Sequence, residues 1–321
     1  MNNNNDAKLL PILSVRNLTK RFGKKPPAIT DLNFDVMPGE FHAFIGANGA
    51  GKTTTIKCII GAYLKKEGTI LINGIDNLKP EAKLNIGYIP EYTKFPPHFS
   101  TYEYLLSLGK IMGLPKALAE QRINTLLDKL HMSKIRNESP NKFSSGQKKK
   151  VILIQALLIN PKLLIMDEPT ANLDPKARIE FFEVLKDLQK QGSSFFISTH
   201  ILSEVNNYAD SLTILDGGKI VLSGKIDEIQ KRYISDNNKY LIKVDNNAKC
   251  EEILKRFNVE YKWNDFNHEY IAKIKSTDTA ADLLKTLIGE KLSVINFAQY
   301  RYSLDEIYEE YVRVGSVHTR D

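Results

Sequence analysis

The sequence predicts an α/β fold followed by a smaller α+β unit, and the distribution of apolar residues carries that prediction. From residue 13 to about 224, short apolar runs alternate with longer segments whose apolar residues recur at helical spacing. The runs at 163–166 and 195–197 are continuously apolar, which is typical of strands buried on both faces of a parallel sheet. After Gly224 the order becomes β-α-β-β-α-β, which is typical of a ferredoxin-like fold.

In the first part, the apolar runs predict strands at residues 41–46, 69–72, 163–166, 195–198 and 212–215. Between Tyr102 and His131 the spacing is helical throughout, and Gly113-Leu114-Pro115 divides this stretch into two helices. We therefore expect a domain over residues 13–235 that contains a helical insertion at about 92–160. The asparagine-rich start predicts a short disordered tail over residues 1–12.

A polar break at residues 236–238 marks the start of the second domain, which is expected to run over 236–321. Its predicted strands and helices are the strands 240–244, 260–263, 270–274 and 293–298 and the helices 250–257, 279–287 and 303–314. Ser303 with Glu306 three residues later forms a capping box for the last helix.

The composition limits the class of protein. The chain has 321 residues, of which 42% are apolar and 26% charged, so a disordered or fibrous chain is excluded. The longest apolar run, 151–159, is broken by Gln155, whereas a membrane helix needs about 20 apolar residues, so no membrane-spanning helix is expected.

Cysteines and charge indicate the surroundings of the protein. Its two cysteines are far apart in the sequence and fit neither a disulfide framework nor a metal cluster, which favours a reducing compartment. The net charge of +7 favours an anionic partner, whether a nucleotide, a nucleic acid or an acidic lipid surface. The lysine run 148–150 is interpreted as a solvated face.

Residues 46–53 read Gly-Ala-Asn-Gly-Ala-Gly-Lys-Thr and match G-x-x-x-x-G-K-[ST] at every fixed position. An apolar strand precedes the motif and a helical run follows it, which is the context that phosphate binding requires. Glycines let backbone N–H groups surround phosphates, and the helix N-terminus adds its positive end. Lys52 is expected to reach the β- and γ-phosphates, and the Thr53 hydroxyl to ligate Mg²⁺.

An apolar strand ends in two adjacent carboxylates, Asp167 and Glu168, followed by Pro169. Neighbouring strand residues point in opposite directions, so the two carboxylates are expected to have different roles. One can hold the Mg²⁺ shell while the other polarises a water for attack on the γ-phosphate. Alone, the same residues also fit an acidic turn at the end of a strand.

Between these motifs stands Phe143-Ser144-Ser145-Gly146-Gln147, which resembles the signature motif of ATP-binding cassette (ABC) ATPases. The common form of that motif is Leu-Ser-Gly-Gly-Gln, so Phe143 and Ser145 are departures from it. Taken alone, the segment also fits an ordinary helix capped by serine.

Four further segments resemble the same family in order and spacing. Asp174, in Thr170-Ala171-Asn172-Leu173-Asp174-Pro175, resembles the D-loop, and His200 resembles the switch histidine after the next strand. Phe22 fits the aromatic residue that stacks on adenine. Residues 86–91 resemble the Q-loop, except that Glu91 replaces the glutamine. The resemblance covers about residues 13–224 and implies the P-loop NTPase fold of an ABC cassette.

The resemblance also implies the cofactors ATP and Mg²⁺ and assigns roles to particular residues. Glu168 becomes the general base, and His200 holds the γ-phosphate and the water; Thr53, Glu91 and Asp167 are the implied Mg²⁺ ligands. The implied ATP contacts are Phe22, Gly46, Ala47, Asn48, Gly49, Ala50, Gly51, Lys52, Thr53 and Thr54 in one chain and, in trans, Ser144, Ser145, Gly146, Gln147 and Asp174 of a second chain.

The C-terminal module and the segment after Glu91 look most like the ATPase subunits of ABC-2 type exporters. This likeness implies a homodimer, or a pair with a paralogous ABC ATPase, on the cytoplasmic face of the cell membrane. It also implies a separate integral membrane permease, docked at the helical insertion, and transport in the direction of export.

Two alternatives remain open. A soluble ABC ATPase acting on ribosomes or nucleic acid suits the pI of about 9.1. Such proteins usually carry two cassettes or long coiled-coil or zinc inserts, so nucleic acid is not the partner we expect. A regulatory nucleotide-binding module that never turns over is the other alternative, and Glu168 and His200 argue against it because a sensor needs no hydrolytic base.

Overall fold

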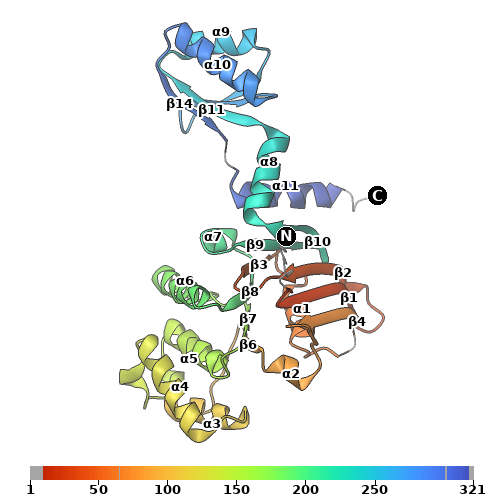
Figure 1. Ribbon diagram of the computed structural model, residues 1–321, viewed down its shortest axis with the longest axis vertical. Coiled ribbons are helices and arrows are strands. Elements are labelled where there is room, and N and C mark those ends of the chain that lie inside the picture. Colours follow the sequence, from red (N-terminus) through yellow and green to blue (C-terminus); the bar gives the residue numbers. More distant parts are fainter. Residues whose placement is uncertain (1–9, 65, 301, 318–321) are drawn as a thin grey trace, which may run out of the picture. The chain divides into compact units, whose positions relative to one another are not determined.

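The structure is a computed structural model that describes residues 10–64, 66–300 and 302–317. Most of the tail predicted at 1–12 lies outside the described residues. The chain divides into two compact units, one built mainly from residues up to Gly224 and the other from Lys225–Glu310 (Figure 1). The second unit starts ahead of residue 236 because it includes helix α8 (Ile226–Asn237). The ring of Tyr233 on this helix packs edge-on against Tyr302, with their centroids 4.5 Å apart.

A six-stranded sheet in the order β10-β9-β3-β8-β7-β6 forms the centre of the first unit. Its strands are β3 (Phe41–Ile45), β6 (Ile86–Ile89), β7 (Leu163–Asp167), β8 (Ser194–Thr199), β9 (Ser211–Asp216) and β10 (Lys219–Lys225). The pairs β3–β8, β3–β9, β7–β8 and β6–β7 are parallel, and β3, β7 and β8 are buried along their whole length. The prediction of buried parallel strands is thus confirmed. Because the strands are parallel, the segments that follow β3, β6, β7 and β8 all leave the same edge of the sheet.

An antiparallel sheet, in the order β2-β1-β4-β5, packs beside the central sheet. Its strands are β1 (Leu13–Arg21), β2 (Pro27–Val36), β4 (Glu67–Ile72) and β5 (Ile75–Asp76). Helix α1 (Lys52–Ile59) and both sheets contribute to one buried core, in which Phe34 of β2 lies 5.5 Å from Phe44 of β3 and 5.6 Å from Phe196 of β8 between ring centroids. This shared core fixes where α1 begins relative to β3.

Helices cover the other face of the central sheet and form the insertion (Figure 1). They are α3 (Thr101–Ile111), α4 (Lys116–Lys129), α5 (Ser145–Leu157) and α6 (Pro175–Lys190), with two short helices, α2 (Pro80–Lys83) and α7 (Leu202–Val205), elsewhere in the unit. The predicted division of the insertion at Gly113 is confirmed, since the chain turns there with φ of 78°.

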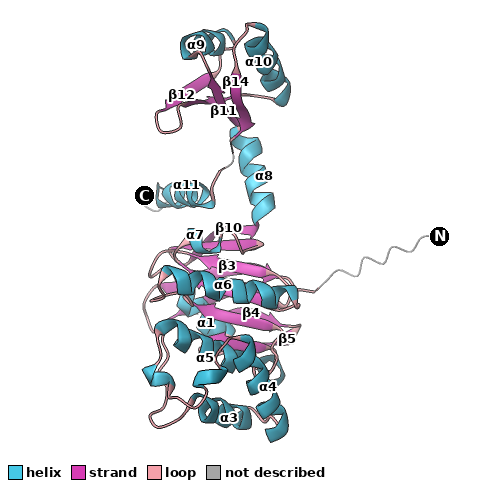
Figure 2. Ribbon diagram, turned by 90° about the vertical axis from the view of Figure 1, so that its left-hand side faces the viewer, coloured by secondary structure: helices cyan, strands magenta, loops and turns pink. Residues whose placement is uncertain are grey.

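The second unit has the predicted element order. After α8 it consists of β11 (Lys239–Val244), α9 (Asn247–Arg256), β12 (Glu260–Asn264), β13 (Glu269–Lys273), α10 (Thr277–Gly289), β14 (Val294–Gln299) and the first part of α11 (Leu304–Val317), up to Glu310. The sheet order is β12-β13-β11-β14, and α9 and α10 lie on one side of it (Figure 2). Ile242, Cys250 and Leu283 are fully buried between sheet and helices. The predicted capping box is confirmed, because Ser303 N donates to Glu306 Oε2 at 2.9 Å and Glu306 N donates to Ser303 Oγ at 3.2 Å.

None of the helices in the described ranges is both long and apolar enough to span a membrane.

Candidate nucleotide-binding site

The loop of residues 46–51 connects β3 to α1, and its shape depends on glycine. A Cβ at Gly46 would lie 2.5 Å from the carbonyl oxygen of Leu215, and one at Gly51 would lie 2.5 Å from Ile29 Cγ2. Gly51 also has φ of 110°, a left-handed conformation that other residues rarely adopt. Helix α1 begins directly after this glycine without a side-chain cap. The first backbone N–H groups of α1 therefore have no side-chain acceptor and can donate to a phosphate.

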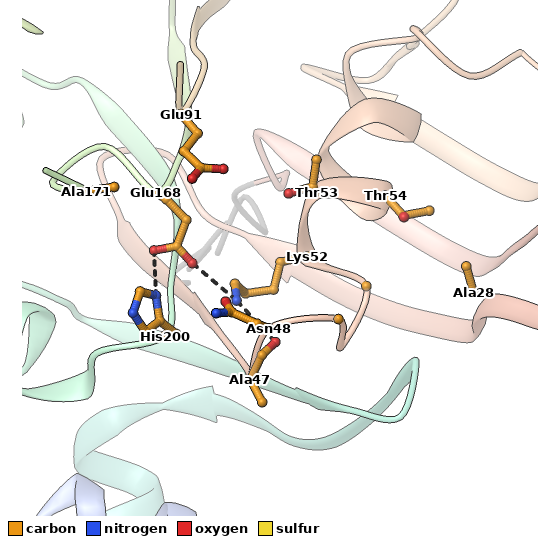
Figure 3. Close-up of a pocket in the computed structure, with 12 residues that line it drawn as sticks. Ala28, Ala47, Asn48, Lys52, Thr53, Thr54, Glu91, Glu168, Ala171 and His200 are labelled. Carbon is orange, nitrogen blue, oxygen red and sulfur yellow. Dashed lines mark hydrogen bonds and ion pairs between the residues drawn. The ribbon is translucent and has the colours of Figure 1, made fainter.

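Three side chains converge beside this loop (Figure 3). Lys52 Nζ lies 3.2 Å from Glu168 Oε1, and His200 Nδ1 lies 2.9 Å from Glu168 Oε2. Lys52 Nζ also donates to the carbonyl of Gly46 at 2.7 Å. The Lys52 and Glu168 side chains are only 7% and 12% exposed, whereas His200 is 44% exposed. A carboxylate is thus held between an ammonium and an imidazole at the wall of a phosphate-binding loop.

Asp167 and Glu168 point in different directions at the end of β7. Asp167 is 2% exposed, and its Oδ1 accepts a hydrogen bond from Ser198 Oγ at 2.7 Å. Glu168 has φ of 45°, which is a strained conformation for glutamate, and its N–H donates to Ser198 Oγ at 3.1 Å and Ser198 O at 3.2 Å. The Glu168 carboxylate thus meets Lys52 at the pocket, whereas Asp167 is buried and bound to Ser198.

Lys52, Glu168 and His200 line one pocket of about 300 Å³. The predicted residues that line it are Ala47, Asn48, Gly49, Gly51, Lys52, Thr53, Thr54, Glu91, Glu168 and His200. Ala28 and Ala171 line it as well, and neither was predicted. Figure 3 shows Glu91 and Glu168 on the opposite side of this pocket from Thr53 and Thr54.

Other predicted residues lie outside that lining. Gly46, Ala50 and Asp167 belong to its supporting layer, since Gly46 accepts from Lys52 and Ala50 is 5% exposed. The ring of Phe22 is 40% exposed and meets Tyr63 edge-on at 5.2 Å. Lys20 Nζ lies 5.1 Å from the centroid of the same ring, and Phe22 does not line the pocket.

The signature and D-loop residues also lie outside the lining; they are Ser144, Ser145, Gly146, Gln147 and Asp174. Ser144 caps α5 in a capping box, because its Oγ accepts from Gln147 N at 3.3 Å and Gln147 Oε1 accepts from Ser144 N at 3.0 Å. Asp174 caps α6 by accepting from Ala177 N at 2.9 Å. Within one chain, these residues therefore shape two helix starts rather than the pocket.

Besides Ala28 and Ala171, two polar residues near the site, Ser198 and Lys149, were not predicted from the sequence. Ser198 holds both Asp167 and the Glu168 backbone, and a polar residue at the end of an apolar strand was the available signal. Lys149 was interpreted as part of a solvated run, but it is 8% exposed and its Nζ lies 3.3 Å from the carbonyl oxygen of Glu91. Burial lowers the pKa of Lys149 to about 8, against the opposing effect of the Glu91 and Asp167 charges.

The site offers hard oxygen donors suited to Mg²⁺, namely the Thr53 hydroxyl and the carboxylates of Glu91 and Asp167. Within residues 10–64, 66–300 and 302–317, no group of three His, Cys, Asp or Glu side chains could enclose a metal ion. Mg²⁺ commonly uses only one or two carboxylates and completes its shell with waters and phosphate oxygens. The donor set therefore fits Mg²⁺ that arrives with a nucleotide.

Comparison with known proteins agrees with this geometry. The ABC transporter family matches residues 29–171, and the DrrA1-3-like ATP-binding protein C-terminal domain matches residues 224–312. A putative ABC transporter ATP-binding protein of Mycoplasma pneumoniae is 43% identical over 305 residues, which cover 94% of this chain and 92% of the relative. The Nod factor export ATP-binding protein I of Cupriavidus pinatubonensis is 33% identical over 68% of this chain and 67% of its own length.

Among solved structures, an ATP-binding subunit of an ABC transporter is 34% identical with a TM-score of 0.63, covering 69% of this chain and 93% of that one. Sequence, fold and pocket thus lead to the same conclusion: the chain belongs to the family of ABC transporter ATP-binding proteins, and it is an ATPase.

Proposed function

We propose that this ATPase hydrolyses ATP at a site shared by two copies and powers export through a separate membrane permease. One observation carries the proposal: Lys52, Glu168 and His200 meet at the phosphate-binding loop, whereas the signature residues 144–147 do not line that pocket. A second cassette, facing the first head to tail, would supply the missing signature wall. This chain has one copy of each motif, so the second cassette is another copy or a paralogue.

In the proposed reaction, Glu168 is the general base. Its carboxylate accepts a proton from the water that attacks the γ-phosphate, and His200, already 2.9 Å from it, holds that carboxylate and the water in line. ATP brings phosphate oxygens to Lys52, which then exchanges its contact with Glu168 for contacts with the nucleotide. The base is thereby released next to the γ-phosphate.

Mg²⁺, when bound with ATP, would supply neutralisation of phosphate charge. Thr53 and Asp167 would hold it, with Glu91 at the third position. The hydrogen bond from Ser198 to Asp167 fixes which carboxylate oxygen remains free for that purpose.

Export is supported by the name of the Cupriavidus relative, a Nod factor export ATP-binding protein. A docking surface for the permease is proposed on the helical insertion. There, Ile111 at the end of α3 is 80% exposed, and a hollow of about 490 Å³ lies between α3 and α4. Leu106, Leu114 and Ala119 contribute apolar lining to this hollow. Such a surface would place the chain on the cytoplasmic face of the membrane.

Affinity purification of the full chain from detergent extracts tests the proposal. We expect a polytopic membrane protein to copurify, and ribosomes or nucleic acid in its place would contradict it. Ile111→Asp should abolish copurification without changing ATP binding. Leu84→Asp, at a leucine 63% exposed outside the insertion, is the matched control and should retain the partner.

A further inference from the structure

We propose that Lys149 is a positioning residue that anchors the loop carrying Glu91 and balances the charge of that carboxylate beside the nucleotide. This inference rests on the proposed role of Glu91 at the Mg²⁺ position. The proposal assigns a role to a buried lysine of α5, the helix that follows the signature motif, and this role concerns the pocket of the same chain.

The geometry of Lys149 is that of an anchor. Its side chain leaves the second turn of α5, is buried, and brings Nζ to 3.4 Å from the carbonyl oxygen of Pro90 and 3.3 Å from that of Glu91. Strand β6 ends at Ile89, so these are the first two carbonyls beyond the ladder that pairs β6 with β7. The ammonium therefore satisfies the backbone at the point where the chain leaves the sheet and enters the pocket wall.

The charges around Lys149 explain why a buried ammonium is tolerated. The negative charges of two carboxylates on neighbouring elements oppose the effect of burial on its pKa: Glu91 on the loop after β6 and Asp167 at the end of β7. The next lysine on the same helix, Lys150, points elsewhere, since its Nζ lies 3.7 Å from Glu180 Oε2 on α6. A buried cation is costly unless opposite charges compensate it, and here the compensating charges are two of the proposed Mg²⁺ ligands.

Charge balance connects Lys149 to the departure at Glu91. A glutamine at position 91 would be neutral, whereas Glu91 adds a negative charge to a pocket wall that must accept the phosphates of ATP. A fixed cation directly behind the loop offsets that repulsion. The glutamate and the buried lysine therefore form one unit, in which the lysine makes the carboxylate compatible with an anionic ligand.

Binding of a fluorescent ATP analogue to the full chain, measured with Mg²⁺, tests this coupling without requiring turnover. Lys149→Met should raise the analogue's Kd by about threefold to tenfold, as expected for one partly screened charge at short range. Adding Glu91→Gln to that variant should restore most of the affinity, because the uncompensated charge is then gone. Lys150→Met, which removes a lysine from the same helix, is the matched control and should bind as the wild type does.

Hydrogen–deuterium exchange measured without nucleotide distinguishes the two proposed effects of Lys149, which are anchoring of the loop and compensation of the Glu91 charge. Lys149→Met should speed amide exchange in residues 91–93. Lys149→Gln keeps a donor for the two carbonyls, so it should speed this exchange less, but it should weaken nucleotide binding as much as Lys149→Met does. Lys149→Gln also serves if the methionine variant fails to fold. Wild-type affinity in both neutral variants, or defects of Lys149→Met and Glu91→Gln that simply multiply, would overturn the proposal. If the wild-type chain itself bound no nucleotide, the ATP site rather than the role of Lys149 would be wrong.

Discussion

Replacing Ser198 with alanine removes one hydroxyl that binds the Asp167 carboxylate and the backbone N–H of Glu168 at the end of β7. Ser198 Oγ donates to Asp167 Oδ1 at 2.7 Å and accepts from the Glu168 N–H at 3.1 Å. Asp167 is 2% exposed, so solvent cannot replace the lost donor. The Glu168 N–H keeps a second acceptor, the Ser198 carbonyl at 3.2 Å, and the strained turn should therefore persist.

The magnitude follows from these contacts. A hydrogen bond to a charged group contributes about 1.5–3 kcal/mol to the free energy of unfolding. For a unit of this size, Tm should then fall by roughly 3–12 °C. Because Asp167 also loses the bond that fixes its orientation, we expect kcat to fall by about tenfold, equivalent to about 1.4 kcal/mol.

Thermal unfolding and steady-state ATPase rates of the full chain measure both effects. Ser194→Ala at the start of the same strand is the matched control, since Ser194 Oγ accepts from Gly39 N at 2.9 Å far along β8 from the pocket. It should cost about 0.5–1.5 kcal/mol of stability and leave kcat unchanged. If Ser198→Ala lowered kcat no more than this control does, the positioning role of the hydroxyl would be refuted.

Three further predictions concern single side chains. Lys52→Ala should weaken ATP binding by more than about tenfold, because the ammonium at the phosphate loop is lost; unchanged affinity with a folded circular-dichroism spectrum would contradict the role of the loop. Glu91→Gln should retain ATPase activity within about tenfold, with a higher half-saturating Mg²⁺ concentration because a charge is lost; identical Mg²⁺ curves would remove Glu91 from the site. Burial lowers the pKa of His42 from 6.5 to about 3, so the unfolded chain takes up a proton below pH 6.5 that the folded chain refuses. Stability that is present above pH 6.5 should therefore fall by about 2 kcal/mol by pH 5, and denaturant unfolding of His42→Gln should lack this component of the pH slope.

Local patterns predicted the parts of the fold that local chemistry determines. Residues 163–166 are all apolar because both faces of this strand are buried. The phosphate loop could be predicted because Gly46 and Gly51 stand where a Cβ has no room. The break at Gly113 follows from its left-handed backbone. Each of these features lies within one short segment, so each is visible in the sequence.

The rest depends on pairings between distant segments. The strand β1 escaped prediction because register shifts between Val15 and Leu18, with Asn17 at φ of 52°, break the alternation of buried and exposed residues. Ser198 meets Asp167 because β7 and β8 pair in that register across 31 positions of sequence. Lys149 looked like the middle of a solvated run, and only the packing of α5 against the loop after β6 buries it.

The mass of the Glu168→Gln protein in the presence of ATP tests most directly the claim that Glu168 is the base of a site shared by two copies. The change is nearly isosteric and removes the proton acceptor, whose contribution is commonly about 10²–10⁴-fold in rate. We predict light scattering to give twice the chain mass of 36.4 kDa, with no phosphate released. Adding Gly146→Asp, at a signature residue outside the pocket of its own chain, should return the protein to the mass of one chain. A single-chain mass for Glu168→Gln with bound ATP, or hydrolysis at the wild-type rate, would contradict the account.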